Sequence, residues 1–145
     1  MSTIRINIKK LNENAQMPTY AKAWDAGADL YASQDCLIHY NDRNLVSTGI
    51  AIEIPEGYVG LIHPRSGMAA NHGITVLNSP GTIDAGYRGE LKVILVNHTG
   101  IDYQITKGDK IAQLVIQKVE EAQFVEVNEI NKSSRGVDGF GSTGV

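Results

Sequence analysis

Apolar and polar residues alternate with a period of two through most of this sequence. The alternation predicts strands over residues 4–8, 50–54, 91–95 and 112–117, and a last strand over residues 124–130, FVEVNEI. Strands that are half-buried against a core show this period, and turn residues separate the strands at short spacing. The pattern therefore predicts an all-β domain, which is a sandwich, a jelly roll or a barrel.

Two segments depart from the alternation. Ser66 is expected to cap a short helix through residues 67–71, which Gly73 would end. Residues 133–145, SSRGVDGFGSTGV, are rich in glycine and lack a strand pattern, so they are expected to form a mobile tail. The expected organisation is one β domain over residues 1–132, followed by this tail.

Composition narrows the classes of function. The chain has 145 residues and a net charge of −3, so no general basic field would gather nucleic acid. Cys36 is the single cysteine, which fits a reducing compartment, and no apolar run is long enough for a secretory signal or a membrane span. The four histidines show no zinc-binding spacing. We expect a cytoplasmic protein with no nucleic-acid or membrane partner.

Residues 63–73, HPRSGMAANHG, are a candidate phosphate site. The free amides at the start of a helix attract anions, and Arg65 and Ser66 would add a guanidinium and a hydroxyl. The alternative is a capped helix with a surface arginine, and these residues alone do not decide between the two.

Residues 75–93 predict a hairpin that could hold a base. Its exposed backbone near Asn78 can read the edge of a nucleobase, and Tyr87 offers a flat face. Asp84, taken as the only carboxylate of the hairpin, could orient and deprotonate a water molecule. The alternative is that Asp84 closes the turn by bonding to the backbone.

Three further features have a plain interpretation, and two of them also have a chemical one. Asp25 and Asp29 lie on either side of Gly27, and Asp29 could hold a water molecule of Mg²⁺ or pair with an arginine, or the segment could simply lead from a turn into a strand. Gln113 lies on a predicted strand, on the face shared with Val115, and could simply be solvated. In the tail, Arg135 and Phe140 could bind phosphate and stack on a base, and Ser142 and Thr143 could donate to phosphate, or the tail could be plainly disordered.

Five blocks of the sequence together resemble the trimeric deoxyuridine triphosphatases, or dUTPases. The blocks are DAGADLYA, PRSGMAANHGI, GTIDAGYRGE, GDKIAQLV and RGVDGFGSTG, in the order typical of that family. The resemblance covers residues 25–144. It implies a jelly-roll β domain, a homotrimer with active sites shared between subunits, and Mg²⁺-assisted hydrolysis of dUTP to dUMP and pyrophosphate. That reaction limits uracil in DNA and supplies the precursor of thymidylate.

The resemblance also implies a role for individual residues. Asp84 would be the catalytic base toward the water that attacks the α-phosphorus. Asn78, Thr82 and Ile83 would bind uracil, Tyr87 would exclude a 2′-hydroxyl, and Lys92 would contact the nucleotide mainly through its backbone. The phosphates would be met by Arg65, Ser66, Gly67, Gln113 and Arg135, with Asp29 supporting Arg65 or a water of the metal. Phe140 would stack over uracil, and Gly141, Ser142 and Thr143 would close on the γ-phosphate.

The sequence differs from the motifs of this family at two positions, and three other functions stand as alternatives to the one that the resemblance implies. Asp138 stands where the tail motif usually has glycine, and Gly86 stands where some members have a second acid. A dCTP deaminase is disfavoured, because Ile94 occupies the place of the catalytic glutamate of those enzymes. A dUTPase-like binding or regulatory module without turnover is the remaining alternative from another class. A structural jelly-roll protein would explain the fold and leave the five blocks unexplained.

Overall fold

The structure, a computed structural model, describes residues 3–144 and consists mainly of antiparallel strands with one helix. The elements, in chain order, are β1 Asn7–Lys10, β2 Ala28–Tyr31, β3 Cys36–Ile38, β4 Arg43–Glu53, β5 Tyr58–His63, α1 Ser66–His72, β6 Ile74–Val76, β7 Gly81–Ile83, β8 Glu90–Asn97, β9 Tyr103–Ile105 and β10 Lys110–Lys118. No helix within the described residues is long and apolar enough to cross a membrane.

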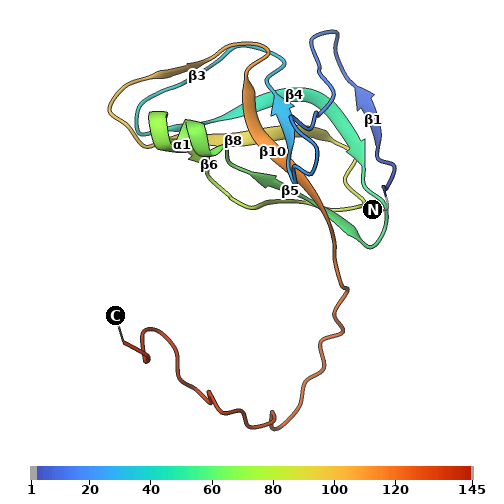
Figure 1. The fold of residues 1–145 in the computed structure, drawn as a ribbon, viewed down its shortest axis with the longest axis vertical. Coiled ribbons are helices and arrows are strands. Elements are labelled where there is room, and N and C mark those ends of the chain that lie inside the picture. The colour runs from blue at the N-terminus through green and yellow to red at the C-terminus, as the bar shows by residue number, and fades with distance from the viewer. Residues whose placement is uncertain (1–2, 145) are drawn as a thin grey trace.

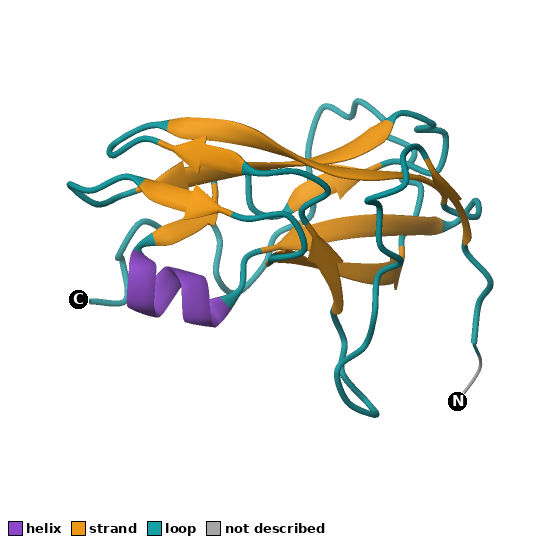
Figure 2. Cartoon of the chain, turned by 90° about the horizontal axis from the view of Figure 1, so that it is seen from above, coloured by secondary structure: helices purple, strands orange, loops and turns teal. Residues whose placement is uncertain are grey.

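Two four-stranded sheets stack on each other as a jelly roll. One has the order β1-β4-β8-β6 and the other β2-β10-β5-β7, while β3 and β9 form a separate pair. Figure 2 shows the strands in stacked layers with α1 at one end of them. The predicted all-β class is confirmed, with the jelly roll as the correct one of its three forms.

The core lies between the sheets and follows the predicted alternation. Ile50, Ile52 and Ile54 of β4 and the following turn are at most 2% exposed, and Leu91, Val93 and Leu95 of β8 are equally buried. Burial of such side chains is the main force that fixes which face of each strand points inward. The register follows from it, with Ile8 of β1 opposite Ile52 of β4.

Two local predictions are wrong in detail. The helix begins at Ser66 itself, and Arg65 is its N-cap, without a side-chain hydrogen bond to the helix. Its predicted end at Gly73 is correct. The expected first strand over residues 4–8 lies three residues later, at Asn7–Lys10, where pairing with β4 begins.

The predicted last strand over residues 124–130 is also wrong, because no strand forms there in the single chain. Residues 119–144 contain no helix or strand and are nearly all exposed, including Phe124 and Ile130 at 95% and 86%. After β10 the chain leaves the body of the molecule and runs along a wide arc (Figure 1). The alternation there is real, but a strand also needs a partner for its backbone, and this segment has none among residues 3–144.

The position at which the chain leaves the body of the molecule can be compared with the predicted domain boundary. The body of the molecule ends with β10 at Lys118, ahead of the predicted domain boundary at residue 132. The predicted tail over residues 133–144 forms turns without a helix or strand and is nearly all exposed. Residues 1, 2 and 145 of the predicted organisation lie outside the described residues. The mobility of the tail stays a prediction.

Candidate active site

One pocket lies where the chain crosses from one sheet to the other between β7 and β8, which are not paired with each other. Its volume is about 510 Å³. It is lined by Leu45, Ile62, Asn78, Gly81, Thr82, Ile83, Asp84, Tyr87, Glu90, Leu91, Lys92 and Ile94. Six of the predicted site residues, Asn78, Thr82, Ile83, Asp84, Tyr87 and Lys92, therefore share one pocket.

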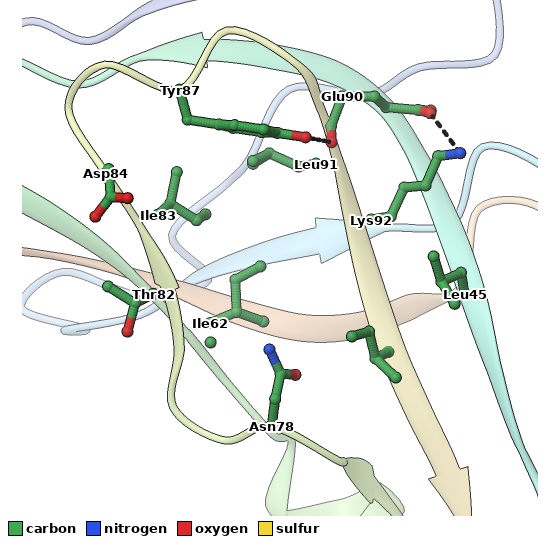
Figure 3. A pocket seen from close by; sticks show the side chains of 12 residues that line it. Leu45, Ile62, Asn78, Thr82, Ile83, Asp84, Tyr87, Glu90, Leu91 and Lys92 are labelled. Carbon is green, nitrogen blue, oxygen red and sulfur yellow. Dashed lines mark hydrogen bonds and ion pairs between the residues drawn. The ribbon is translucent and has the colours of Figure 1, made fainter.

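Tyr87 forms one wall of this pocket. Figure 3 shows its ring above Leu91, with the hydroxyl directed at Glu90, and the hydroxyl donates a 2.9 Å hydrogen bond to the backbone carbonyl of Glu90. A Cβ atom at Gly89 would collide with that hydroxyl. Gly89 is therefore required for the ring to lie where it does.

Asp84 opens the turn that follows β7. The turn is closed by a 3.1 Å backbone hydrogen bond from the Tyr87 N–H to the Asp84 carbonyl. Among the residues that the structure describes, the Asp84 carboxylate accepts no hydrogen bond and forms no ion pair, so the alternative of a side-chain bond that closes the turn is not observed. The carboxylate is left to solvent or a ligand.

The polar edge of the pocket comes from β7 and Asn78. β7 pairs with β5 and is the last strand of its sheet, so its other edge keeps backbone donors and acceptors unpaired within the described chain. Asn78 lies at the opposite end of the pocket from Tyr87 in Figure 3. Such an edge can pair with a planar ring that has donors and acceptors of its own.

Glu90 is a residue that the sequence reasoning missed, and it corrects the view of Asp84 as the hairpin's only carboxylate. One Glu90 oxygen accepts a 3.0 Å hydrogen bond from the Gly49 N–H, and the other lies 3.6 Å from Lys92 Nζ. Glu90 thus joins β8 to the irregular part of β4. Its carboxylate is occupied, which leaves Asp84 as the carboxylate of this pocket without a partner in the described chain.

A second, smaller pocket of about 300 Å³ gathers three other predicted residues, Asp29, Arg65 and Gln113. Asp29 is 7% exposed, and its two oxygens lie 2.8 Å from Lys110 Nζ and 3.7 Å from Arg65 Nε. The hydrogen bond to Asp29, and then its negative charge, raise the pKa of Lys110. A buried carboxylate needs such cations to stay charged.

Lys110 is the second residue that the sequence reasoning missed. Its backbone carbonyl also accepts a 3.3 Å hydrogen bond from Arg65 Nη1, while Arg65 Nε is buried without a hydrogen-bond partner. Asp29 is far from Lys110 in the sequence, and only the pairing of β2 with β10 brings the two together. Arg65 and Lys110 are the two cations that line the second pocket, and Asp25 and Asp29 line it as well.

The loop over residues 21–27 forms the rim of the second pocket. A Cβ atom at Gly27 would lie 2.5 Å from Gln113 Oε1, so glycine lets Gln113 pack against this loop. Trp24, the single tryptophan of the chain, is in the same loop with a φ of 73° and is 82% exposed. Its side chain is thus largely in solvent.

The remaining predicted residues lie outside both pockets. Ser66 is the first residue of α1 and is exposed, and Gly67 lines a neighbouring hollow of about 380 Å³ that also includes Arg65 and Lys110. In the tail, Arg135 Nε donates to the Asp138 carbonyl at 3.1 Å, and Phe140 is fully exposed. The tail residues Gly141, Ser142 and Thr143 line neither pocket.

The two pockets are at different places along β5. Asp29, Gln113 and His63 form one row across β2, β10 and β5. Ile83, which precedes Asp84, pairs with Gly60, three residues earlier on β5 than His63. At about 3.3 Å per residue, this leaves about 10 Å of strand between the row and the start of the turn.

Metal ligands are sparse in both pockets. No group of three or more His, Cys, Asp or Glu side chains that could hold a metal ion occurs within residues 3–144. Both oxygens of Asp29 already face cations. The donor set fits an ion held mainly by oxygens of a bound phosphate chain, with Asp29 in indirect contact, and does not fit a metal site made of protein ligands alone.

Comparison with known proteins gives a consistent result. A family model described as dUTPase matches residues 13–144. The deoxyuridine 5′-triphosphate nucleotidohydrolase of Thermobifida fusca is 54% identical over 143 residues, which is 98% of this chain and 80% of the relative. The enzyme of the same name from Helicobacter hepaticus is 51% identical over 145 residues, which is 100% of this chain and 92% of the relative.

Solved structures show the same fold. A mutant dUTPase of Staphylococcus bacteriophage 80alpha, solved with dUpNHpp, superimposes with a TM-score of 0.91 at 31% identity, covering 99% of this chain and all of the other. A mutant dUTPase of phage phi11 of S. aureus, described for its coordination of a structural Mg(II) ion, has a TM-score of 0.81 at 30% identity. It covers 87% of this chain and 98% of the other.

Proposed function

Since the chain belongs to the dUTPase family, we propose that it hydrolyses dUTP to dUMP and pyrophosphate in the pocket beneath Asp84 and Tyr87. The observation that supports this placement best is the unpaired Asp84 carboxylate at the mouth of a pocket with a polar backbone edge. The neighbouring carboxylate, Glu90, is already occupied.

Asp84 acts as the general base. Its carboxylate accepts a proton from a water molecule, the water oxygen bonds to the α-phosphorus, and the bond from that phosphorus to the bridging oxygen of pyrophosphate breaks. Pyrophosphate leaves with the electron pair of that bond. A base held within hydrogen-bond reach of the attacking water contributes about 10²- to 10⁴-fold to such a step.

The uracil ring pairs with the free edge of β7 and with the amide of Asn78. Thr82 and Ile83 supply the backbone donors and acceptors of that edge. Cytosine reverses the donor and acceptor at N3 and at the group on C4, which would leave the protein groups facing them unpaired; this is the stronger filter, while thymine is rejected by the lack of room for its methyl group. Tyr87 packs on the deoxyribose and excludes a 2′-hydroxyl, and the Lys92 backbone completes this wall.

The phosphate chain binds to Arg65 and Lys110, the two cations that line the second pocket. Arg65 and Gln113 line it, and Ser66 and Gly67 lie beside it at the start of α1. Mg²⁺ would be held by the phosphate oxygens, with Asp29 reaching it through a water molecule, and would neutralise charge there. Arg65 itself stabilises the charge that develops in the transition state.

The site is completed by other copies of the chain. The pocket proposed for uracil and the pocket proposed for the phosphates are separated along β5. The segment over residues 124–130 has the alternation of a strand but no strand partner within the described part of its own chain. A homotrimer brings different pockets together and gives this segment a neighbour to pair with. Arg135, Phe140, Gly141, Ser142 and Thr143 then close over nucleotide bound between neighbouring copies.

The first test is pyrophosphate release by the purified protein with Mg²⁺, comparing dUTP with dCTP, dTTP and UTP. Release from dUTP alone is expected. Equal release from UTP would contradict the role of Tyr87, and equal release from dTTP would contradict the tight pocket around uracil. No release from any of the four, with retained binding of dUpNHpp, would favour the alternative of a binding module without turnover.

The proposal also includes the cellular compartment of the enzyme. A single cysteine, Cys36, fits a reducing compartment, and we propose the cytoplasm. No nucleic-acid or membrane partner is invoked. Immunolocalisation of the tagged full chain tests this assignment, and recovery in a secreted fraction would contradict it.

A further inference from the structure

Arg88 holds the turn between Asp84 and Tyr87 from the side away from the nucleotide pocket. Its Nη1 donates to the carbonyl of Ala85 at 2.6 Å and to the carbonyl of Tyr87 at 3.1 Å. Its Nη2 lies 3.7 Å from a Glu53 oxygen, and the other Glu53 oxygen accepts a 3.0 Å hydrogen bond from Asn7. One guanidinium therefore links the turn to β1 and β4 of the other sheet.

Besides Arg88, the turn is held by the packing of Ala85 against the core and by the bond from the Tyr87 hydroxyl to Glu90. Within it, the structure gives one backbone hydrogen bond, from the Tyr87 N–H to the Asp84 carbonyl. A Cβ atom at Gly86 would meet nothing within 4 Å, so no other part of the chain packs over the tip. The two carbonyls that Arg88 binds lie on either side of Gly86.

A guanidinium is suited to this task. The two hydrogens of Nη1 lie in the rigid plane of the guanidinium, so binding two carbonyls with them restrains the relative position of those carbonyls, which a freely rotating ammonium does less well. Hydrogen bonds from a charged donor are also stronger than neutral ones. The contact with Glu53 is an exposed ion pair, which contributes little by itself, so the two carbonyl bonds are the main restraint.

We propose that Arg88 is a positioning residue of the dUTP hydrolysis reaction, which fixes the Asp84–Tyr87 turn so that the carboxylate and the ring keep their relative places. The proposal rests on the function proposed for Asp84 and Tyr87. Arg88 itself does not line the nucleotide pocket, and it acts through the backbone of the turn.

The test compares Arg88→Ala and Arg88→Lys with wild type, using dUTP and Mg²⁺. Since misplacement of a catalytic group by about 1 Å can cost about 10²-fold, kcat is expected to fall about 10- to 100-fold in Arg88→Ala. Arg88→Lys should retain more activity, and KM should change less than kcat. Arg43→Ala, at another exposed arginine on β4, is the matched control and should behave as wild type.

Recovery of kcat on adding free guanidinium distinguishes loss of the Arg88 contacts from a general loss of stability, because guanidinium would not restore a destabilised protein. The Arg88 side chain is 56% exposed beside an open hollow of about 360 Å³, so guanidinium can enter the space that Arg88→Ala leaves. At concentrations far below those that unfold proteins, it should restore part of kcat in Arg88→Ala and lower or leave unchanged that of wild type. No recovery, together with a loss of activity that follows a loss of Tm, would overturn the proposal.

Hydrogen exchange in the ligand-free protein tests the restraint without any turnover. Residues 84–88 should exchange faster in Arg88→Ala than in wild type, while β4 and β8 should not change. Unchanged exchange in the turn, or wild-type kcat in Arg88→Ala, would contradict the proposal. Failure of the proposed base would appear elsewhere, as retained turnover in Asp84→Asn, and would leave the exchange result for Arg88 intact.

Discussion

At the scale of the residue, chemistry in this protein depends on which side chains are left without partners. Glu90 and Asp29 are bound to an amide and to cations of their own chain, whereas the Asp84 carboxylate has no partner among residues 3–144. A carboxylate that is already paired is a poor proton acceptor, because protonation would break its contacts. The pairing pattern thus distinguishes Asp84, the proposed general base, from Asp29 and Glu90, whose carboxylates already have partners.

Asp84→Asn keeps the shape of the side chain and removes the base. We expect kcat to fall by about 10²- to 10⁴-fold. The dissociation constant of dUpNHpp should stay near that of wild type. Pyrophosphate release and isothermal titration calorimetry measure the two quantities, and near-normal turnover would show that another group takes the proton.

Gly89→Ala tests the wall of the sugar pocket. The new Cβ atom would collide with the Tyr87 hydroxyl and displace the ring. The ratio of kcat/KM for dUTP to that for UTP should therefore decrease, by an amount that parallel rate measurements give. Gly86→Ala is the control, since its Cβ atom meets nothing within 4 Å. An unchanged ratio in Gly89→Ala would show that Tyr87 does not select the sugar.

Sequence reasoning identified the residues of the site that stand in short continuous motifs and missed those that act through distant partners. Asn78, Asp84 and Tyr87 stand in one short stretch, residues 78–87, so a local pattern reveals them. The importance of Lys110 appears only when β10 pairs with β2 and brings it to Asp29. The role of Glu90 depends in the same way on Gly49 of β4.

At the scale of the element, alternation predicted the strands that are buried on one face, because burial is what maintains the period. It failed at residues 124–130, where the period is present and the backbone partner is not. It did not predict β3 and β9, because strands of three residues are too short to show the period and depend on contacts at their ends. One of these contacts is made by Asp102.

Asp102 gives the β3–β9 region an acid-sensitive contact. The N–H of Tyr40 donates to its carboxylate at 2.9 Å, and His39 lies 3.3 Å away. The Tyr40 hydrogen bond, followed by His39, lowers the pKa of Asp102. Because the folded pKa lies below the unfolded one, this contact stabilises the protein above the unfolded pKa of about 3.9, and the gain is lost as the pH falls through the folded value.

Asp102→Asn should therefore have a lower Tm than wild type at neutral pH. The difference should shrink below about pH 4 and vanish once the wild-type carboxyl is protonated. Scanning calorimetry over a series of pH values measures it. A difference that stays constant across the series would mean that the amide fails for steric reasons, and the linkage would be wrong.

At the scale of the whole molecule, the body and the chain end have separate tasks. Residues 119–144 add no buried side chain to the core, so the body should fold without the last segment. The proposed closure of the tail requires a bound nucleotide and a neighbouring copy. Stability and activity should therefore respond differently when this segment is removed.

A chain that ends at Ser134 should keep the Tm of wild type and lose most of its turnover, because the tail no longer excludes water from bound dUTP. Calorimetry and pyrophosphate release measure the two effects. A chain that ends at Lys118 should in addition associate less tightly in analytical ultracentrifugation, since it lacks the segment over residues 124–130. Unchanged turnover in the first chain would show that the tail has no part in catalysis.

The exposed indole of Trp24 gives this enzyme a built-in optical signal. It is the single tryptophan of the chain, it stands in solvent, and its loop forms the rim of the pocket assigned to the phosphates. Collisional quenchers such as iodide reach a ring in this position, and a nucleotide or a closing tail that covers the rim would shield it. The fluorescence of the unlabelled protein therefore offers a direct record of binding and release, in real time and without any substitution.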